Sequence, residues 1–128
     1  MLIKDKIIQT IICFFILIFF TVNISAEEFN IEAKEIAIDE KNNILVGKGS
    51  VKVTDSDGNI IEGQKVTYEK SKEFLLIEDE VKIYNVDGNT LETDRASYDK
   101  LKDLIITYKN SELYLNNGYK VKSNIIRY

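Results

Sequence analysis

Residues 61–69 read IEGQKVTYE, and this short stretch decides the fold because it does not occur alone. The same pattern recurs at positions that differ from it by multiples of thirty residues: IEAKEIAID at 31–39, LETDRASYD at 91–99 and VKSNIIRY at 121–128. The copies align without any gap. A period of this size indicates one supersecondary unit stacked on copies of itself, so we predict a repeat architecture with an incomplete fourth copy.

Each copy contains short apolar patches that alternate with polar residues. In the copy that begins at Ile61, the patches are residues 66–68, 74–77 and 81–84. Alternation over so few residues predicts β-strands, and no helical stripe persists for three turns. The copies also carry Asp-Gly or Asn-Gly pairs, which tight hairpin turns favour because glycine tolerates positive φ: residues 57–58, 87–88 and 117–118. We therefore predict an all-β chain of about three antiparallel repeats, arranged as a sandwich, a jelly roll or a solenoid.

The parity of the apolar positions switches once in each copy. Ile61 and Gly63 share one parity, whereas Val66 and Tyr68 have the opposite one. Because side chains alternate faces along a strand, such a switch requires a bulge or a bend. We predict corners where strands pass between sheets at Lys34-Glu35, Gln64-Lys65 and Asp94-Arg95. We predict that a set of apolar residues points inward, beginning with Ile36, Ile38, Ile44, Val46, Val51 and Val53. The set continues with the counterparts of these residues thirty and sixty positions later.

The composition excludes several classes of function. The sequence has 17 Lys and Arg against 21 Asp and Glu, so it lacks the excess of basic residues typical of a nucleic-acid-binding protein. It has no His, and its single cysteine, Cys13, lies in the N-terminal apolar run. The repeats therefore cannot form a disulfide, the usual His or Cys metal site, or a His-based nucleophile relay. Residues 55–59 resemble a calcium loop only faintly, because the twelfth position is Val66 rather than an acidic residue. We expect neither a metal nor a cofactor.

Residues 1–26 do not follow the repeat and have the features of a secretory signal peptide. Lys4 and Lys6 precede an unbroken apolar run at residues 11–20, and a small alanine ends the segment before two glutamates. The run is shorter than the roughly 20 residues that a membrane span needs. We predict a signal peptide cleaved after residue 26 and a β-domain at 27–128; an uncleaved anchor is the alternative. Because the last copy is one strand long, we expect the domain either to continue in a longer protein or to offer that strand to a partner.

Two motifs in the copies match a known family. Residues 61–68 have its apolar residue, small residue, acidic or amide residue and apolar-x-Tyr strand, and residues 81–83 match a later Val-x-Val strand as Val-Lys-Ile. A Gly-x-Val-x-Val motif is present at residues 49–53, whereas Asp79-Glu80 stand where the next copy should carry glycine. On these residues, the stretch from Phe29 to Tyr128 resembles the OstA-like domain of the lipopolysaccharide-transport family. The resemblance implies an open, V-shaped β-jelly roll.

That resemblance implies a non-enzymatic module for lipopolysaccharide transport and assembly, which shields acyl chains in an apolar groove between the inner and outer membranes. The family includes a periplasmic bridge protein, an inner-membrane-anchored protein and the N-terminal domain of an outer-membrane translocon, and the signal-like leader favours the first or the last. The implied partners are lipopolysaccharide, through its lipid A acyl chains, and other jelly-roll domains joined edge to edge. These domains would link the chain to the outer or inner membrane. The implied location is the periplasm, with association with the outer membrane in the translocon case; no nucleic acid is implied.

A groove of this kind has a simple physical basis. An acyl chain that enters the space between two splayed sheets gains about 0.8 kcal/mol per buried methylene. The residues expected to line the groove and contact lipid are Ile36, Ile38, Val46, Val51, Val53, Val66, Tyr68, Leu76, Val81, Ile83, Ala96, Tyr98, Ile106 and Leu113.

The residues alone leave other functions open. An ordinary closed sandwich core also requires an apolar inward set, so a structural or adhesive surface β-solenoid without lipid cargo is the alternative. An enzyme with paired carboxylates is a third hypothesis, with Glu62 and Glu92 as candidates, but residues that recur with the repeat indicate architecture. Tyr68, Tyr98 and Tyr128 recur in the same way and fit packing or corner positions better than headgroup contacts.

Overall fold

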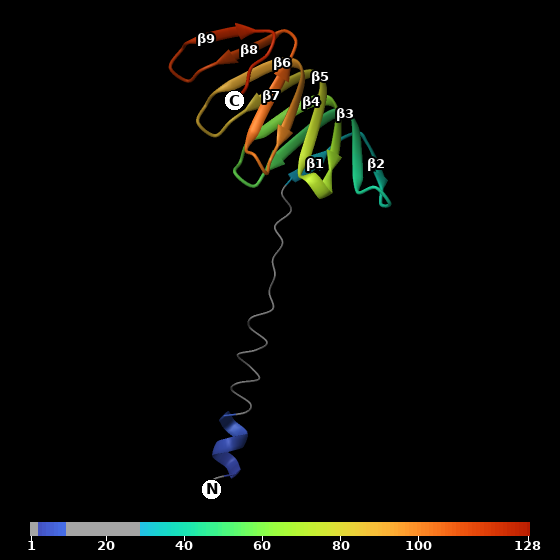
Figure 1. Cartoon of the computed structure of the whole chain (residues 1–128), viewed down its shortest axis with the longest axis vertical. Coiled ribbons are helices and arrows are strands. Elements are labelled where there is room, and N and C mark those ends of the chain that lie inside the picture. The colour runs from blue at the N-terminus through green and yellow to red at the C-terminus, as the bar shows by residue number, and fades with distance from the viewer. Residues whose placement is uncertain (1–2, 10–28) are drawn as a thin grey trace.

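A computed structural model describes residues 3–9 and 29–128 (Figure 1). Residues 3–9 are helical. Within the described ranges, no helix is long and apolar enough to cross a membrane. The predicted apolar run at 11–20 and the cleavage point after residue 26 lie outside the described residues, so the signal peptide at 1–26 stays a prediction.

The repeats are built from antiparallel strands. In the described part of the chain they form a 9-stranded sheet, with one 3-10 turn, η1 (Lys70–Lys72). The order of pairing is β1-β3-β4-β5-β6-β8-β9, with β2 also on β3 and β7 also on β6. The strands are β1 (Phe29–Glu32), β2 (Glu35–Asp39), β3 (Ile44–Asp55), β4 (Ile60–Glu69), β5 (Phe74–Tyr84), β6 (Thr90–Asp99), β7 (Leu104–Tyr108), β8 (Ser111–Tyr114) and β9 (Lys120–Ser123).

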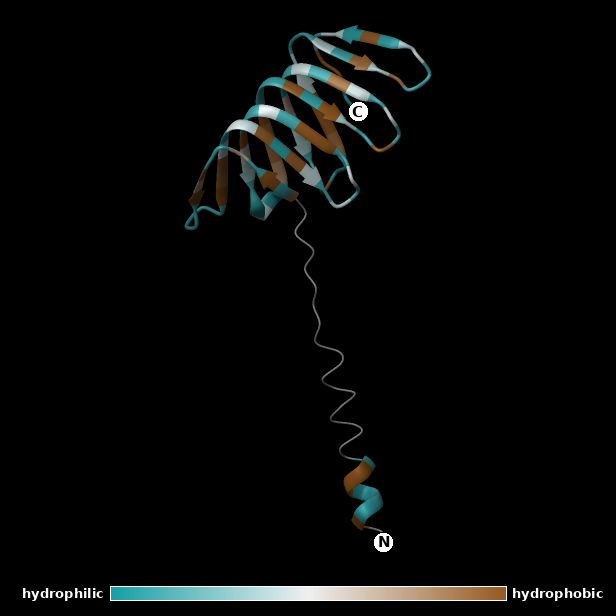
Figure 2. Cartoon of the chain, turned by 180° about the vertical axis from the view of Figure 1, so that it is seen from behind, coloured by the Kyte–Doolittle hydropathy of each residue, from teal (hydrophilic) through white to brown (hydrophobic). Residues whose placement is uncertain are grey.

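The long strands β3 to β6 bend near their middles, so that one half of each strand lies in one layer and the other half in a second layer (Figure 1). Apolar and polar residues alternate along these strands (Figure 2). β1 and β2 pair with opposite halves of β3, and β7 and β8 pair with opposite halves of β6. We call the layers A and B: layer A contains residues 29–32, 51–62, 81–92 and 111–123, and layer B contains residues 35–48, 65–78, 95–108 and 124–128.

The last residues extend layer B beyond β7. The amide of Ile105 donates to the carbonyl of Tyr128, and the amide of Thr107 donates to the carbonyl of Ile126, each at 2.9 Å. The fourth copy is thus divided between the layers, with β9 in layer A and residues 124–128 in layer B. The whole is an open, all-β jelly roll made of antiparallel repeats, as the sequence predicts.

The predicted corners are present and lie within one residue of their expected places. In β4 the pairing with β5 shifts register between Glu62 and Lys65, which places the bend at Gly63-Gln64. The bend requires a small residue, because a Cβ on Gly63 would lie 2.6 Å from Cγ2 of Ile77. The equivalent positions separate β1 from β2 and divide β6 between its partners β7 and β8.

A second set of bends was not predicted. It lies on the intervening strands, where the register shifts between Lys48 and Val51 and again between Glu78 and Val81. At each of these bends two successive residues have positive φ: Gly49 (80°) and Ser50 (45°), Asp79 (65°) and Glu80 (54°), Lys109 (67°) and Asn110 (50°). The family pattern has a glycine at residues 79–80 because the backbone there must adopt positive φ. Asp79 and Glu80 adopt the same conformation in this chain, but with strain.

The predicted parity of the strands that follow the layer B loops was wrong. Tyr68 stands opposite Leu75, and Val66 opposite Ile77, and directly opposed residues share a face of the sheet. The inward residues are therefore Leu75 and Ile77, not Leu76. Five other residues that were predicted to point inward lie on the outer face by the same register: Ile44, Val46, Phe74, Leu104 and Ile106.

The strain at the second set of bends can be relieved by glycine. Replacing Glu80 with glycine keeps the left-handed conformation but removes its cost to an L-residue, which is about 1–2 kcal/mol. The greater freedom of glycine in the unfolded chain partly offsets this gain. We expect Glu80→Gly to raise the free energy of unfolding by about 0.5–1 kcal/mol, measured by urea denaturation. Lys82→Gly, two residues further along the same exposed face of β5, should lower it by a similar amount, and equal losses in both variants would contradict strain at Glu80.

Candidate functional site

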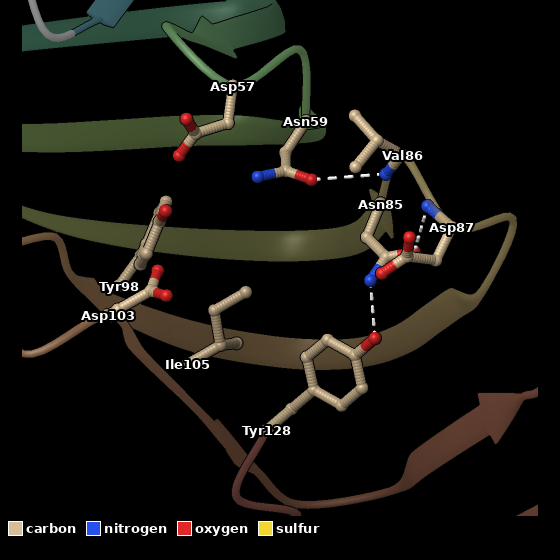
Figure 3. A pocket seen from close by; sticks show the side chains of 9 residues that line it. All are labelled: Asp57, Asn59, Asn85, Val86, Asp87, Tyr98, Asp103, Ile105 and Tyr128. Atoms are coloured by element: carbon tan, nitrogen blue, oxygen red, sulfur yellow. Dashed lines mark hydrogen bonds between the residues drawn. The ribbon is translucent and has the colours of Figure 1, made fainter.

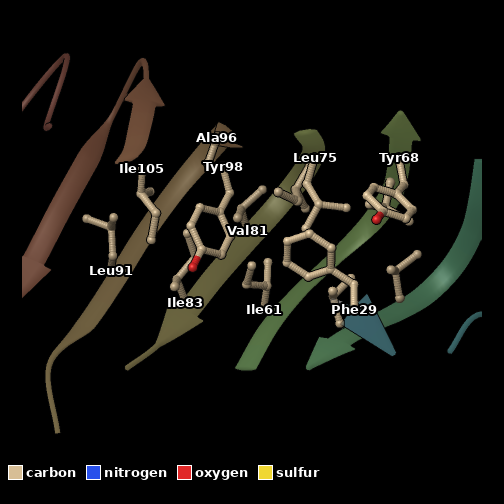
Figure 4. Close-up of a cluster of buried hydrophobic side chains, with 14 of the residues drawn as sticks. Phe29, Ile61, Tyr68, Leu75, Val81, Ile83, Leu91, Ala96, Tyr98 and Ile105 are labelled. Atoms are coloured by element: carbon tan, nitrogen blue, oxygen red, sulfur yellow. The ribbon is translucent and has the colours of Figure 1, made fainter. Parts of the chain in front are cut away.

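The interior between the layers is apolar and is contributed by both of them (Figure 4). Phe29 of layer A packs edge-to-face against Tyr68 and Tyr98 of layer B, with ring centroids 5.2 and 5.7 Å apart. Such aromatic pairs contribute about 0.5–1.5 kcal/mol beyond their burial. The predicted groove residues that are buried in this interior are Val51, Val53, Val66, Tyr68, Val81, Ile83, Ala96, Tyr98 and Leu113.

The other predicted groove residues are not buried. Ile36 and Ile38 face inward by register, opposite Gly47 and Leu45, but are 47% and 65% exposed because β2 is an edge strand. Val46, Leu76 and Ile106 are half-buried on the outer face, as the corrected register requires. Cross-strand pairing would have identified the interior residues that the sequence analysis missed, which are Phe29, Ile61, Leu75, Ile77, Leu91, Ile105 and Ile126.

On the side opposite the bends, the two layers end in two rows of loops that form the mouth of the interior. Layer A ends in the hairpin turns 55–59, 85–89 and 115–119, and layer B ends in the loops 40–43, 70–73 and 100–103. The turns are stacked through asparagine: the amide of Val86 donates to Oδ1 of Asn59 at 3.2 Å, and the amide of Asn116 to Oδ1 of Asn89 at 2.9 Å. The predicted turns are confirmed, with positive φ at their glycines.

A set of charged side chains crosses the mouth near the first turn. The hydroxyl of Tyr98 donates to Oδ2 of Asp55 at 3.1 Å, and Nζ of Lys100 lies 3.8 Å from the same oxygen. Lys100 also forms an ion pair with Asp57, with 2.5 Å between Nζ and Oδ2. Because these contacts join a layer A turn to the end of a layer B strand, we call the four residues the ionic bridge.

Asp55 is the buried centre of the ionic bridge, with a side chain that is 0% exposed. Besides Tyr98, it accepts hydrogen bonds from the amides of Asp57 and Asn59 and from Nδ2 of Asn59. Burial opposes its ionisation, but the hydrogen bonds from Asn59 and Tyr98 and the charge of Lys100 outweigh burial and hold its pKa below the usual value. Burial and the charge of Asp55 raise the pKa of Tyr98 to about 12, so at neutral pH the tyrosine is a neutral donor to a carboxylate.

A second set of side chains crosses the mouth one repeat later (Figure 3). Asn85 and Asn89 of a layer A turn both donate from Nδ2 to the hydroxyl of Tyr128, at 2.8 Å for Asn89. Asn85 organises its turn as Asp55 does, since its Oδ1 accepts from the amides of Asp87 and Asn89. We call Asn85, Asn89 and Tyr128 the neutral bridge.

The two bridges are equivalent positions of the repeat. Tyr98 and Tyr128 are thirty residues apart, as are Asp55 and Asn85, and each tyrosine lies 43 residues after its partner. Tyr98 and Tyr128 thus join the layers through their hydroxyl groups, a role that the repeat pattern did not predict. The bridges differ in charge and in burial, because Tyr98 is 2% exposed and Tyr128 is 39% exposed.

A pocket of about 560 Å³ lies at the mouth between the two bridges (Figure 3). It is lined by Asp57, Asn59, Asn85, Val86, Asp87, Tyr98, Asp103, Ile105 and Tyr128. Ile105 belongs to the apolar interior, so the pocket leads from a polar rim toward that interior. Its volume is within the range of about 300–1,000 Å³ that is typical of small-molecule sites.

The carboxylates proposed for an enzyme are on the outer surface. Glu62 stands opposite Lys52 and Lys82 in the sheet, and Glu92 stands opposite Lys82 with 3.8 Å between Nζ and Oε1. Within residues 3–9 and 29–128, no group of three or more His, Cys, Asp or Glu residues could hold a metal ion. The candidate functional site is therefore the interior and its mouth.

Comparison with known proteins gives a structural relative. No family model matches the chain, and no curated protein matches it. Its structure is similar to the crystal structure of LptH, the LptA-homologous periplasmic component of the lipopolysaccharide transport device of Pseudomonas aeruginosa. The TM-score is 0.71 at 16% sequence identity, over 78% of this chain and 74% of LptH. The predicted likeness to an LptA-type jelly roll is confirmed for the fold.

The ionic bridge should contribute measurably to stability. Asp55→Asn keeps the shape of the side chain but removes the charge to which Tyr98 and Lys100 are paired. We expect the free energy of unfolding at pH 7 to fall by about 1.5–3 kcal/mol, the range for a hydrogen bond to a charged group. Urea denaturation measures the change, with Asp103→Asn, an exposed residue of the same mouth, as a control that should stay within about 0.5 kcal/mol.

The difference in the free energy of unfolding between the original chain and Asp55→Asn should depend on pH. Because the pKa of Asp55 is lowered by folding, its charge stabilises the fold above the unfolded pKa of about 3.9, and this stabilisation is lost as the pH falls through the folded pKa. The difference in the free energy of unfolding should therefore be full at neutral pH and narrow as the pH falls through the folded pKa of Asp55. Hydrogen bonds from Tyr114 and Lys120 lower the pKa of Glu112 to about 2. Because Glu112 titrates in both proteins, its contribution to the free energy of unfolding cancels in the difference. A difference of constant size would contradict a charged Asp55.

Proposed function

We propose that this chain is a non-enzymatic carrier for lipopolysaccharide, which holds the acyl chains in the interior between layers A and B. The observation that carries the proposal is an apolar interior that both layers share, within a fold similar to that of LptH. LptH is itself a periplasmic component of a lipopolysaccharide transport device. The proposal places this chain in the periplasm, between the inner and outer membranes.

The interior can hold an acyl chain only if the layers separate. Val53, Val66 and Ile77 are 0% exposed, because side chains of the two layers fill the space between them. The layers share backbone along the bends, whereas side chains make the bridges across the mouth. An acyl chain that enters between the separated layers gains about 0.8 kcal/mol per buried methylene. Its transfer to another interior of the same kind costs little net free energy.

Both ends of the jelly roll support the proposed partners. At one end the edge strands β1 and β2 leave Ile36 and Ile38 exposed on the face that continues the interior. At the other end lie β9 and residues 124–128. An unpaired strand edge is a template for another strand, so a further jelly-roll domain could add to either end and continue the apolar interior. Through such domains the chain would reach the outer or inner membrane.

A structural role without lipid is the second candidate. The observation that favours it is the complete burial of interior residues such as Leu75 and Val66, which is also what a permanently closed core shows. In that case the chain would act through its strand edges as a surface solenoid. The lipid proposal and this alternative differ in one property, which is whether the interior opens.

Photo-crosslinking in cells distinguishes the two. A photoreactive residue is placed at Val51 or Val81, which are 2% and 1% exposed in the interior, and at Lys52 or Lys82, their exposed neighbours on the outer face. We expect adducts with lipopolysaccharide from the interior positions and none from the lysine positions. Absence of adducts at all four positions, in a chain that is exported and folded, would reject the carrier and favour the closed core.

A further inference from the structure

The bridges that close the mouth are unequal in strength. The ionic bridge combines a buried carboxylate, a lysine whose side chain is 13% exposed and a nearly buried tyrosine. The neutral bridge consists of two amide groups and one hydroxyl, and Tyr128 is 39% exposed. Hydrogen bonds between neutral, solvent-exposed groups contribute much less than a buried bond to a charged group. Separation of the layers should therefore begin at the neutral bridge.

The pocket lies where such an opening would lead. Its wall contains Tyr98 of the ionic bridge at one end and Asn85 and Tyr128 of the neutral bridge at the other. Ile105 connects it to the interior, packing in the same cluster as Leu91 and Leu113. A movement of Tyr128 away from the two asparagines would widen the pocket on the side where Ile105 borders the interior.

We propose that this pocket is a lateral port through which acyl chains enter the interior, and that the neutral bridge is the part that opens while the ionic bridge stays closed. The inference rests on the proposed function. It adds a route from the side to passage along the axis between the ends. Asp57, Asp87 and Asp103 on the rim disfavour a phosphate inside the port, so the acyl chain enters and the anionic headgroup stays outside.

Cross-linking each bridge in turn tests the port. The full chain with Cys13→Ser carries either Asn85→Cys with Tyr128→Cys, or Asp57→Cys with Lys100→Cys, and a reducible bis-thiosulfonate reagent joins each pair. Uptake of fluorescently labelled lipid A is followed in time. Because uptake scales with the population of the open state, the link at the neutral bridge should slow it by at least about tenfold, and reduction should restore it. The link at the ionic bridge should change it by less than about twofold.

The outcomes separate the port from the carrier function. If unlinked protein takes up no lipid A, the carrier function and the port both fail. If every form takes up lipid A at the same rate, or if the ionic-bridge link slows uptake as much as the neutral-bridge link does, the carrier function stands and the port is rejected.

A milder variant tests the port without a cross-link. Tyr128→Phe removes only the hydroxyl that accepts from Asn85 and Asn89, so it should quicken lipid A uptake by about threefold or more while circular dichroism stays unchanged. Tyr119→Phe, in a neighbouring turn where the tyrosine is 71% exposed, is the control and should leave the rate unchanged. A rate for Tyr128→Phe equal to that of the control would reject the role of the neutral bridge.

Discussion

Side chains alternate between the two faces of a strand, and this constraint governs the whole jelly roll. A strand that crosses from one layer to the other must keep apolar residues inward on both sides of the bend, so it must change parity there. The chain does this with a bulge in every long strand, at Gly63-Gln64 in β4 and at Asp79-Glu80 in β5. Since the bends stack on one another, each copy must have the same length, which explains a period of thirty residues without gaps.

The two sides of the interior are held in different ways. Along the bends the backbone itself connects the layers, so they cannot separate there without unfolding. Across the mouth the contacts are polar side chains, such as Tyr98 with Asp55 and Tyr128 with Asn85. An interior that is joined by backbone on one side and closed by side chains on the other suits the proposed role of a carrier, whose ligand arrives and leaves without chemical change.

Local pattern was enough to predict the repeat, the turns and one set of bends, because each depends on residues close together in the sequence. It failed for Leu76 and Ile106, since the parity of a returning strand depends on the register that the preceding loop imposes. It also failed for Ile36 and Ile38, whose exposure follows from their place on an edge strand. The bridges join residues 43 positions apart in different layers, so Asp55 looked like an ordinary turn residue until the layers were assembled.

The left-handed bends have a consequence for how such domains diverge. What the copies share at these positions is a pair of left-handed backbone conformations, which Gly49-Ser50, Asp79-Glu80 and Lys109-Asn110 all adopt. A copy can therefore lack the glycine and still form the bend. The strain of the left-handed residues is then offset by the packing of the other copies. Different residues at such bends are thus compatible with one fold, and this chain and LptH share a fold with a TM-score of 0.71 at 16% sequence identity.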